Sequence, residues 1–412
     1  MKFEKYHISD DIKKNLAKLG FIKPTDIQFK AMPSILKGED VLAVAQTGTG
    51  KTAAFAIPII NMIHSTKRSK RWCGIRCVVM VPTRELALQI GEVFASLSKH
   101  TKVKSFALCG GVDQDKQIDR LISGVDILIT TPGRMFDLIN QEYISLNYVE
   151  FLVLDEADHM LELGFIEDIK YVKKMLARKH QTLFFSATIS DKIKKLAYSQ
   201  VRSNAIRIQI SPKDPVSKNV THYVMFVEMD DKRFFLEQFI KDNPASKMIV
   251  FVRTKVRAVR VAAAMGRVGI DSLEIHGDKE QDKRTEVMKK FKESQCKLLI
   301  ATDISARGIN VVDIEYVINY DLPVKTENYV HRVGRTGRGF NKGIAISFCS
   351  KEERQLLDEI QGFLNKEIEV IKVSKKDYSA VISPASGEHD WKSLIEEEER
   401  FKAEKKRKKR TP

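Results

Sequence analysis

Short apolar runs recur along the chain and are separated by segments with the periodicity of amphipathic helices. In the first half the runs cover residues 41–45, 77–81, 105–108, 127–130, 151–154 and 182–185. Apolar runs of this length are typical of parallel strands that helices cover on both faces. Because strand, helix and strand alternate throughout residues 40–210, we expect an α/β domain with a parallel sheet in the first half.

A second series of the same kind starts after residue 218. Its expected strands cover residues 223–227, 248–252, 272–276, 298–301, 316–319, 344–348 and 368–373. The polar octapeptide between the two series contains two prolines, which is typical of a semi-extended linker. We therefore expect an N-terminal domain over residues 1–210, a linker over 211–218, a C-terminal domain over 219–373 and a mostly disordered tail over 374–412, in which residues 391–404 could form a helix.

The stretch AVAQTGTGKT (residues 43–52) follows the first apolar run and leads into an apolar helix. Its glycines allow a tight turn, and the N–H groups of such a loop converge on an anion at the positive end of the helix dipole. In this pattern Lys51 reaches the β- and γ-phosphates of a nucleotide, and Thr52 holds Mg²⁺. Ala45 stands where the pattern has its first glycine, so a small-residue loop without phosphate chemistry is the alternative.

The acidic sequence Asp155-Glu156-Ala157-Asp158 follows the apolar run 151–154. Next to a nucleotide, Asp155 would hold Mg²⁺, often through water, and Glu156 would orient or deprotonate the attacking water. An isolated acidic cluster is usually a solvated turn. The buried strand before it and the phosphate loop upstream favour the catalytic interpretation.

Three other strand ends in the first half carry hydroxyl, glycine or arginine residues. They are Pro82-Thr83-Arg84, Gly110-Gly111 and Thr131-Pro132-Gly133-Arg134. Ligand sites of open α/β sheets lie at the carboxyl ends of strands, where a hydroxyl and a guanidinium suit a phosphate backbone. Each stretch alone is more simply a helix cap with a surface arginine, but the repetition favours one continuous track for a nucleic-acid backbone.

Two weaker signals flank these stretches. Gln28, about 20 residues before the phosphate loop, has an amide that can both donate to and accept from the edge of adenine, and Phe21 could stack on the base. A loop that leads into a helix explains this region equally well. Ser186-Ala187-Thr188 ends the last apolar run of the first half and could sense the state of a nucleotide.

The second half lacks a GKT sequence but has its own polar clusters. Thr302 and Asp303 end one expected strand, and residues 331–338 hold three arginines, a histidine and two glycines. Arg335 and Arg338 lie three residues apart and could point at one phosphate. An arginine supplied from another domain stabilises the charge that develops on a transferred phosphoryl group, whereas the alternative is a solvated basic face.

Composition narrows the choice of partner. The chain has 412 residues, 43% hydrophobic content and a net charge of +16, which excludes a disordered protein and favours a polyanionic partner. Residues 400–410 alone contribute eight Lys or Arg against one Glu. The five scattered cysteines indicate free thiols in a reducing compartment, and without an apolar signal core or a run of 18 apolar residues we expect a soluble, cytoplasmic protein.

Taken together, these stretches resemble the DEAD-box RNA helicases, a branch of helicase superfamily two. The resemblance covers about residues 3–373, with the motifs in family order and the DEAD tetrapeptide at 155–158. The short basic C-terminal extension looks like the bacterial RhlE-type subgroup. The resemblance implies two tandem RecA-like parallel-sheet domains that together hydrolyse ATP and bind RNA.

The resemblance also implies roles for individual residues. It places Phe21, Thr25 and Gln28 at the adenine, with Phe3 as the upstream aromatic residue, and Thr47, Gly48, Thr49, Gly50, Lys51 and Thr52 at the phosphates. It places Asp155 and Glu156 at Mg²⁺ and the attacking water. From the second domain it places Asp303 at the nucleotide and gives Arg335 and Arg338 the role of arginine fingers. On RNA it places Pro82, Thr83, Arg84, Gly110, Gly111, Thr131, Pro132, Gly133, Arg134, Arg253, Gly277, Gln281, Arg284 and Thr302, and for coupling Ser186, Thr188 and His331.

Four positions depart from the family pattern. Asp26 stands where proline is usual, Ser305 and Asn310 stand where alanine and aspartate are common, and Arg253 stands where asparagine is frequent. None of these changes removes a catalytic group. Asn310 would still form hydrogen bonds but would carry no charge.

We therefore expect an ATP-dependent RNA helicase with ATP and Mg²⁺ as cofactors. It would couple ATP binding and hydrolysis to the unwinding of short RNA duplexes or to RNA–protein remodelling, as a monomer, with ribosomal or RNA-decay complexes as possible partners. An ATP-gated RNA clamp with little unwinding is the first alternative. A DNA-directed motor is the second.

Overall fold

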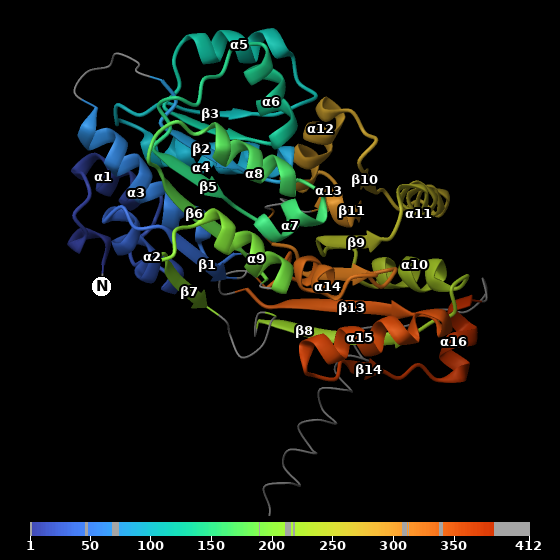
Figure 1. Cartoon of the computed structure of the whole chain (residues 1–412). Helices are drawn as coiled ribbons and strands as arrows, with labels where there is room; N and C mark the ends of the chain where they lie inside the picture. Colours follow the sequence, from blue (N-terminus) through green and yellow to red (C-terminus); the bar gives the residue numbers. More distant parts are fainter. Residues whose placement is uncertain are drawn as a thin grey trace, which may run out of the picture. The chain divides into compact units, whose positions relative to one another are not determined.

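The computed structural model describes residues 2–45, 48–67, 74–188, 190–210, 216, 219–306, 311, 313–337 and 341–382. The chain divides into two compact units, residues 1–213 and 214–412. Each unit is built around its own sheet (Figure 1).

The first unit holds a seven-stranded parallel sheet in the order β3-β4-β2-β5-β6-β1-β7. Its strands are β1 (Val41–Ala45), β2 (Cys77–Met80), β3 (Ser105–Leu108), β4 (Ile127–Thr130), β5 (Phe151–Leu154), β6 (Gln181–Ser186) and β7 (Ile206–Ile210). The helical elements are η1 (Phe3–Lys5), α1 (Asp10–Lys18), α2 (Asp26–Leu36), α3 (Lys51–Thr66), α4 (Arg84–Ser98), α5 (Gln114–Ile122), α6 (Pro132–Asn140), α7 (Ala157–Glu162), α8 (Ile166–Met175) and α9 (Asp191–Gln200).

Alternate residues of each central strand enter two different cores. Val41 and Ala43 of β1 pack with residues of α1 to α4, whereas Leu42 and Val44 pack with residues of α6 to α9 on the other face. Because both faces of the sheet are covered, every position of β1 is buried and apolar. The first unit is therefore a three-layered α/β domain.

The second unit repeats this architecture with the strand order β10-β11-β9-β12-β13-β8-β14, again all parallel. Its strands are β8 (Val220–Phe226), β9 (Met248–Val252), β10 (Leu273–Ile275), β11 (Leu298–Thr302), β12 (Tyr316–Asn319), β13 (Gly343–Cys349) and β14 (Glu369–Ile371). The helical elements are α10 (Lys232–Asp242), α11 (Lys255–Arg267), α12 (Gln281–Lys292), α13 (Asp303–Ala306), α14 (Thr326–Val333), η2 (Lys351–Glu353), α15 (Arg354–Leu364) and α16 (Lys375–Ile382).

Every strand expected from an apolar run is present, with ends shifted by at most a few residues. Two elements differ from expectation. Strand β7 was not predicted, because its alternating sequence IRIQI lies at the sheet edge and is only partly buried. Helix α16 occupies the start of the segment that we expected to be mostly disordered, where the Tyr378 ring packs 4.9 Å from that of Phe235 and its hydroxyl donates to Asp231.

Some expectations fall outside the described residues. They concern most of the linker 211–218 and the tail from residue 383 onward. In the described part of the chain, no helix is both long enough and apolar enough to cross a membrane. The described cysteines, Cys77, Cys109, Cys296 and Cys349, carry free thiols.

Candidate nucleotide and nucleic-acid sites

The phosphate loop connects β1 to α3. Gly48 and Gly50 adopt φ angles of 81° and 91°, in the left-handed region that glycine reaches without strain. Lys51 is the first residue of α3 and is only 6% exposed, and its Nζ has no hydrogen-bond partner in the described part of the chain. A buried amine at the positive end of a helix is unfavourable unless an anion joins it, so this loop fits a phosphate group. Thr47 lies outside the described residues.

Gln28 ties the segment before β1 to the phosphate loop. Its Nε2 donates to the Gly50 carbonyl oxygen at 3.1 Å, and its Oε1 accepts from the Thr25 N–H at 3.0 Å. A Cβ at position 50 would lie 2.5 Å from the same Nε2, and the φ of 91° is one that other residues rarely adopt, so the loop favours glycine there. The Phe21 ring is 36% exposed and packs edge-on against Phe3, with 6.5 Å between the ring centroids. Its exposed surface leaves room for a stacked base.

Asp155 and Glu156 follow β5 directly, at the carboxyl edge of the sheet. Both side chains are buried, and the Asp155 Oδ1 accepts the Glu156 N–H at 3.0 Å. Burial raises the pKa of Asp155 to about 6; the Lys51 charge opposes this shift, and the Glu156 charge adds to it. Glu156 adopts φ 50°, an uncommon conformation for a residue other than glycine. The free site therefore concentrates negative charge that a cation would relieve.

Asp158 connects the acidic segment to the end of β6, and the sequence analysis gave it no role. Its Oδ2 accepts the Thr188 N–H at 2.9 Å, the Thr188 Oγ1–H at 3.0 Å and the Ala187 N–H at 3.2 Å. The Ser186 Oγ donates to the Thr188 carbonyl oxygen at 2.7 Å. Thr188 is thus held directly by the acidic segment that carries Asp155, and Ser186 is connected to that segment through Thr188.

The three expected backbone-binding stretches of the first unit follow β2, β3 and β4, which are neighbours in the sheet. Thr83 caps α4, since its Oγ1 accepts the Leu86 N–H at 3.3 Å. Arg84 is exposed, and its guanidinium lies against Gly110, where an added Cβ would be 3.2 Å from Nη2. Among the described residues, the buried Nη1 of Arg134 has no hydrogen-bond partner. The cap interpretation of Thr83 is correct, and the adjoining arginines remain available to an anion.

The other residues that the sequence analysis selected in the first unit lie in the same three stretches as Thr83, Arg84 and Arg134. Pro82 and Pro132 are buried, Gly111 and Gly133 are exposed, and Thr131 precedes α6 as its N-cap residue. Together the stretches form a row along one edge of the first sheet. The order of the strands therefore places the three similar stretches next to one another, although they are far apart in the sequence.

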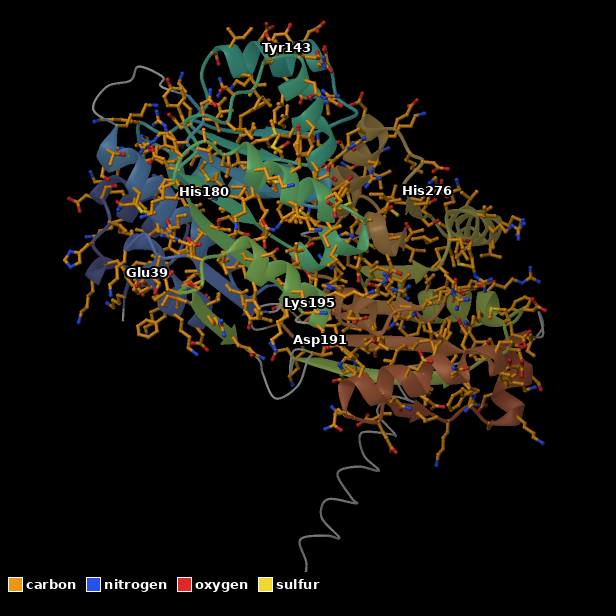
Figure 2. All side chains as sticks on the ribbon, in the orientation of Figure 1. Glu39, Tyr143, His180, Asp191, Lys195 and His276 are labelled. Atoms are coloured by element: carbon orange, nitrogen blue, oxygen red, sulfur yellow. The ribbon has the colours of Figure 1, made fainter. Side chains whose placement is uncertain are left out.

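In the second unit, β10, β11 and β9 are neighbours, and each ends in residues that the sequence analysis selected. Gly277 follows His276, which Figure 2 labels near the end of β10, and Arg284 donates to the His276 carbonyl oxygen at 3.4 Å. Gln281 begins α12 and is buried. At the end of β11, the Thr302 and Ser305 hydroxyls lie 3.0 Å apart.

Asp303 makes an ion pair that sequence reasoning missed. Arg332 binds it through two nitrogens, with Nε at 2.5 Å from Oδ1 and Nη2 at 2.9 Å from Oδ2. Arg332 is also fully buried and donates from Nη1 to the Asp321 carbonyl oxygen at 2.6 Å. A bidentate, buried pair of this kind fixes the carboxylate of Asp303 at the sheet edge.

Arg253 is anchored by a buried ionic cluster. Its Nη2 lies 2.9 Å from Oε1 of Glu353, whose Oε2 bonds the fully buried Lys232 Nζ. The same amine donates to the Tyr320 carbonyl oxygen at 2.8 Å. The Arg253 side chain keeps 40% of its surface exposed, so it is held from beneath and is accessible from outside.

The expected arginine fingers are described only in part. The Arg335 side chain is buried, and its Nε donates to the His331 carbonyl oxygen at 3.1 Å. His331 is buried as well. Arg338 lies outside the described residues, as does Asn310.

Sequence comparison identifies two families along the chain. The family described as DEAD/DEAH box helicase matches residues 25–196, and the family described as Helicase conserved C-terminal domain matches residues 231–339. The chain is 38% identical over 377 residues to the ATP-dependent RNA helicase RhlB of Shewanella sp. (strain MR-4), covering 90% of this chain and 85% of that protein. It is 38% identical over 359 residues to the DEAD-box ATP-dependent RNA helicase CshA of Bacillus cereus (strain ATCC 10987 / NRS 248), covering 87% of this chain and 67% of that protein.

Solved structures of the same family are also similar to this chain. S. cerevisiae Dbp5 bound to RNA and ADP BeF3 superimposes with a TM-score of 0.83 at 29% identity, over 93% of this chain and all of that chain. The expected pair of RecA-like parallel-sheet domains is thereby confirmed. The RhlE-type subgroup stays a prediction. On its sequence and its fold, the chain belongs to the family of DEAD-box ATP-dependent RNA helicases.

Proposed function

We propose that this protein hydrolyses ATP in response to RNA and uses the cycle to unwind short RNA duplexes locally or to remodel RNA–protein complexes. The observation that carries the proposal is the buried Lys51 amine at the start of α3, whose charge acts on the buried Asp155. Membership of the family and the similarity to an RNA-bound Dbp5 structure support RNA as the second ligand.

In this proposal the first unit holds the nucleotide. Phe21, Thr25 and Gln28 contact the adenine, and Thr47 to Thr52 hold the phosphates, with Lys51 on the β- and γ-phosphates. Mg²⁺, held by Thr52 and Asp155, would neutralise charge on the phosphates. Glu156 orients the attacking water and accepts its proton.

The residues selected at the carboxyl edges of the two sheets bind the RNA backbone. In the first unit these are Pro82 to Arg84, Gly110, Gly111 and Thr131 to Arg134; in the second they are Arg253, Gly277, Gln281, Arg284 and Thr302. Contacts to phosphates and sugars make the binding largely independent of sequence.

Both ligands favour one closed arrangement, so each should favour binding of the other. In that arrangement Arg335 and Arg338 stabilise the charge that develops on the γ-phosphoryl group, and Asp303 contacts the nucleotide. Ser186, Thr188 and His331 connect hydrolysis to strand separation. Two bonds support this role: Ser186 bonds the Thr188 carbonyl oxygen, and the Thr188 hydroxyl bonds Asp158 of the acidic segment.

A long-lived, ATP-gated RNA clamp uses the same residues and is the second candidate; a DNA-directed motor is the third. We further propose that the protein acts in the cytoplasm as a monomer, with ribosomal or RNA-decay complexes as possible partners.

The test is steady-state ATP hydrolysis with and without single-stranded RNA. We expect strong stimulation in the wild type and none in Glu156→Gln. Glu167→Gln is the matched control, because Glu167 is an exposed glutamate of α8 that pairs only with Lys170 among the described residues. Hydrolysis indifferent to RNA would contradict the proposal. Duplex unwinding from RNA or DNA loading strands then separates a helicase from a clamp and from a DNA motor.

A further inference from the structure

Helix α11 carries an exposed apolar stripe next to basic side chains. Val256 and Val259 are 51% and 46% exposed, and Ala263 is exposed one turn further on. Arg260 and Arg267 are exposed beside them. Because these positions recur every three or four residues, they share one face of the helix. The opposite face packs into the core of the second unit through Ala258, Val261 and Met265.

The charge of α11 is entirely positive. Its sequence KVRAVRVAAAMGR contains four basic residues and no acidic one. Lys255 pairs with Asp278 at 2.5 Å, and Arg257 pairs with Asp321 at 2.9 Å. In the described ranges, Arg260 and Arg267 have no ion-pair partner. The outward face of α11 therefore suits a partner that is both apolar and acidic.

The chain itself contains a segment of this composition, WKSLIEEEERF (residues 391–401). Trp391, Leu394 and Ile395 have the spacing of one helical face. Glu396–Glu399 follow them as four consecutive carboxylates. The segment thus supplies the two properties that the α11 face is suited to bind.

The segment can reach α11 from the place where the described chain ends. Helix α16 is fixed on α10 by Tyr378, whose hydroxyl donates to Asp231 at 2.8 Å. Helices α10, α11 and α16 all pack on one face of the second sheet, and α10 contacts both of the others. Residues 383–390 span at most about 26–29 Å when extended. Packed helices lie about 8–10 Å apart, so two such steps are within this reach.

We propose that residues 391–401 dock as an amphipathic helix, within the same molecule, on the outward face of α11. Trp391, Leu394 and Ile395 cover the exposed valines, and Glu396–Glu399 pair with Arg260 and Arg267. A short tether gives an effective concentration of about a millimolar, so a weak contact suffices. The docked segment would hold the basic run 402–410 beside the second unit. This inference concerns an internal interaction surface and does not depend on the proposed helicase activity.

The test uses Trp391 as its own probe. Trp72 and Trp391 are the only tryptophans, so Trp72→Phe leaves one reporter in the full chain. In the docked state we expect blue-shifted emission and protection from acrylamide quenching. Val259→Asp or Arg260→Glu should shift the emission to the red, with a change of about tenfold in the docked-to-undocked ratio, which corresponds to 1.4 kcal/mol. Val324→Asp is the control, because Val324 is 62% exposed and lies outside α11.

A charge exchange tests the pairing and does not depend on how well one variant folds. Arg260→Glu combined with Glu396→Lys and Glu399→Lys should restore the protected emission, and Glu396→Gln with Glu399→Gln should abolish it in an unchanged α11. Red emission in the parent, or emission that Val259→Asp and Arg260→Glu leave unchanged, would overturn the proposal. Protection that depends on protein concentration would instead assign the contact to a second copy. Protection that appears only with RNA would assign it to RNA.

Discussion

Replacing Asp155 with asparagine should stabilise the free protein and destroy its ATPase. The structure buries this carboxyl group, and burial raises its pKa from 3.8 to about 6. Below about pH 3 the carboxyl is protonated in both folded and unfolded chains, so burial of its charge costs nothing. As the pH rises from about 4 to about 6, the unfolded chain ionises this group while the folded chain keeps it protonated, so stability falls, and above about pH 6 the full loss is present. A shift of about two pKa units corresponds to about 3 kcal/mol.

Asparagine keeps an oxygen that can accept the Glu156 N–H, but it also buries an amide donor, which costs about 1 kcal/mol. The net gain at about pH 8 is then about 2 kcal/mol, or about 4–8 °C in Tm for a domain of this size. Calorimetric unfolding of the full chain without nucleotide or divalent cation measures it. The gain should fall to under about 1 kcal/mol at about pH 5 and vanish between about pH 4 and 5, because the cost of the buried charge disappears only as the pH approaches the pKa of the unfolded chain. ATP hydrolysis should fall by at least about 100-fold.

Asp40→Asn is the matched control, because this buried carboxylate lies in the same unit and has the opposite environment. Burial alone would raise its pKa, but hydrogen bonds from Arg202 and from the Thr182 and Arg202 amides lower it below the usual value. The Asp40→Asn variant loses the charge that these donors stabilise, so the first unit should unfold at a lower Tm than in the wild type. If Asp155→Asn unfolds at or below the wild-type temperature at about pH 8, or if its gain is the same at both pH values, the reasoning is wrong.

Three other predictions address coupling, RNA contact and the tail. Thr188→Val removes the hydroxyl that donates to Asp158, so RNA-stimulated hydrolysis should persist while duplex unwinding falls by about tenfold; equal loss of both would argue against a coupling role. Arg253→Asn should weaken RNA binding and reduce the salt slope of log K by about one, as measured by fluorescence anisotropy, because one phosphate contact is lost. Truncation after Ile382 spares α16 and should lower RNA affinity and its salt dependence with basal ATPase intact; an unchanged slope would exclude the tail from RNA binding.

The two sheets were predictable because their strands are local features. Fully apolar runs such as 151–154 require burial on both faces, and a parallel sheet between two helical layers provides it. Strand β7 and helix α16 carried no such signal, because only one residue of β7 and none of α16 is buried. Their structure depends on packing against β1 and α10.

In the candidate site too, local features were predictable from the sequence and long-range contacts were not. The phosphate loop and the acidic segment were found because each is contiguous and its chemistry is explicit in a few letters. The contacts that hold these motifs in place were not found. Asp158 meets Thr188 across 30 residues, Arg332 meets Asp303 across 29, and Glu353 meets Arg253 across 100.

By itself, the sequence determined the repeated α/β pattern, the phosphate loop, the acidic strand end and the family. The tertiary structure decided which strand ends are neighbours, which carboxylate is buried and shifted in pKa, and which arginine is held by an internal acid. The reason is that backbone periodicity and loop geometry are set by residues close together in the chain. Desolvation and ion pairing are set by whatever the fold brings within a few ångströms, and the order of strands in the sheet decides that.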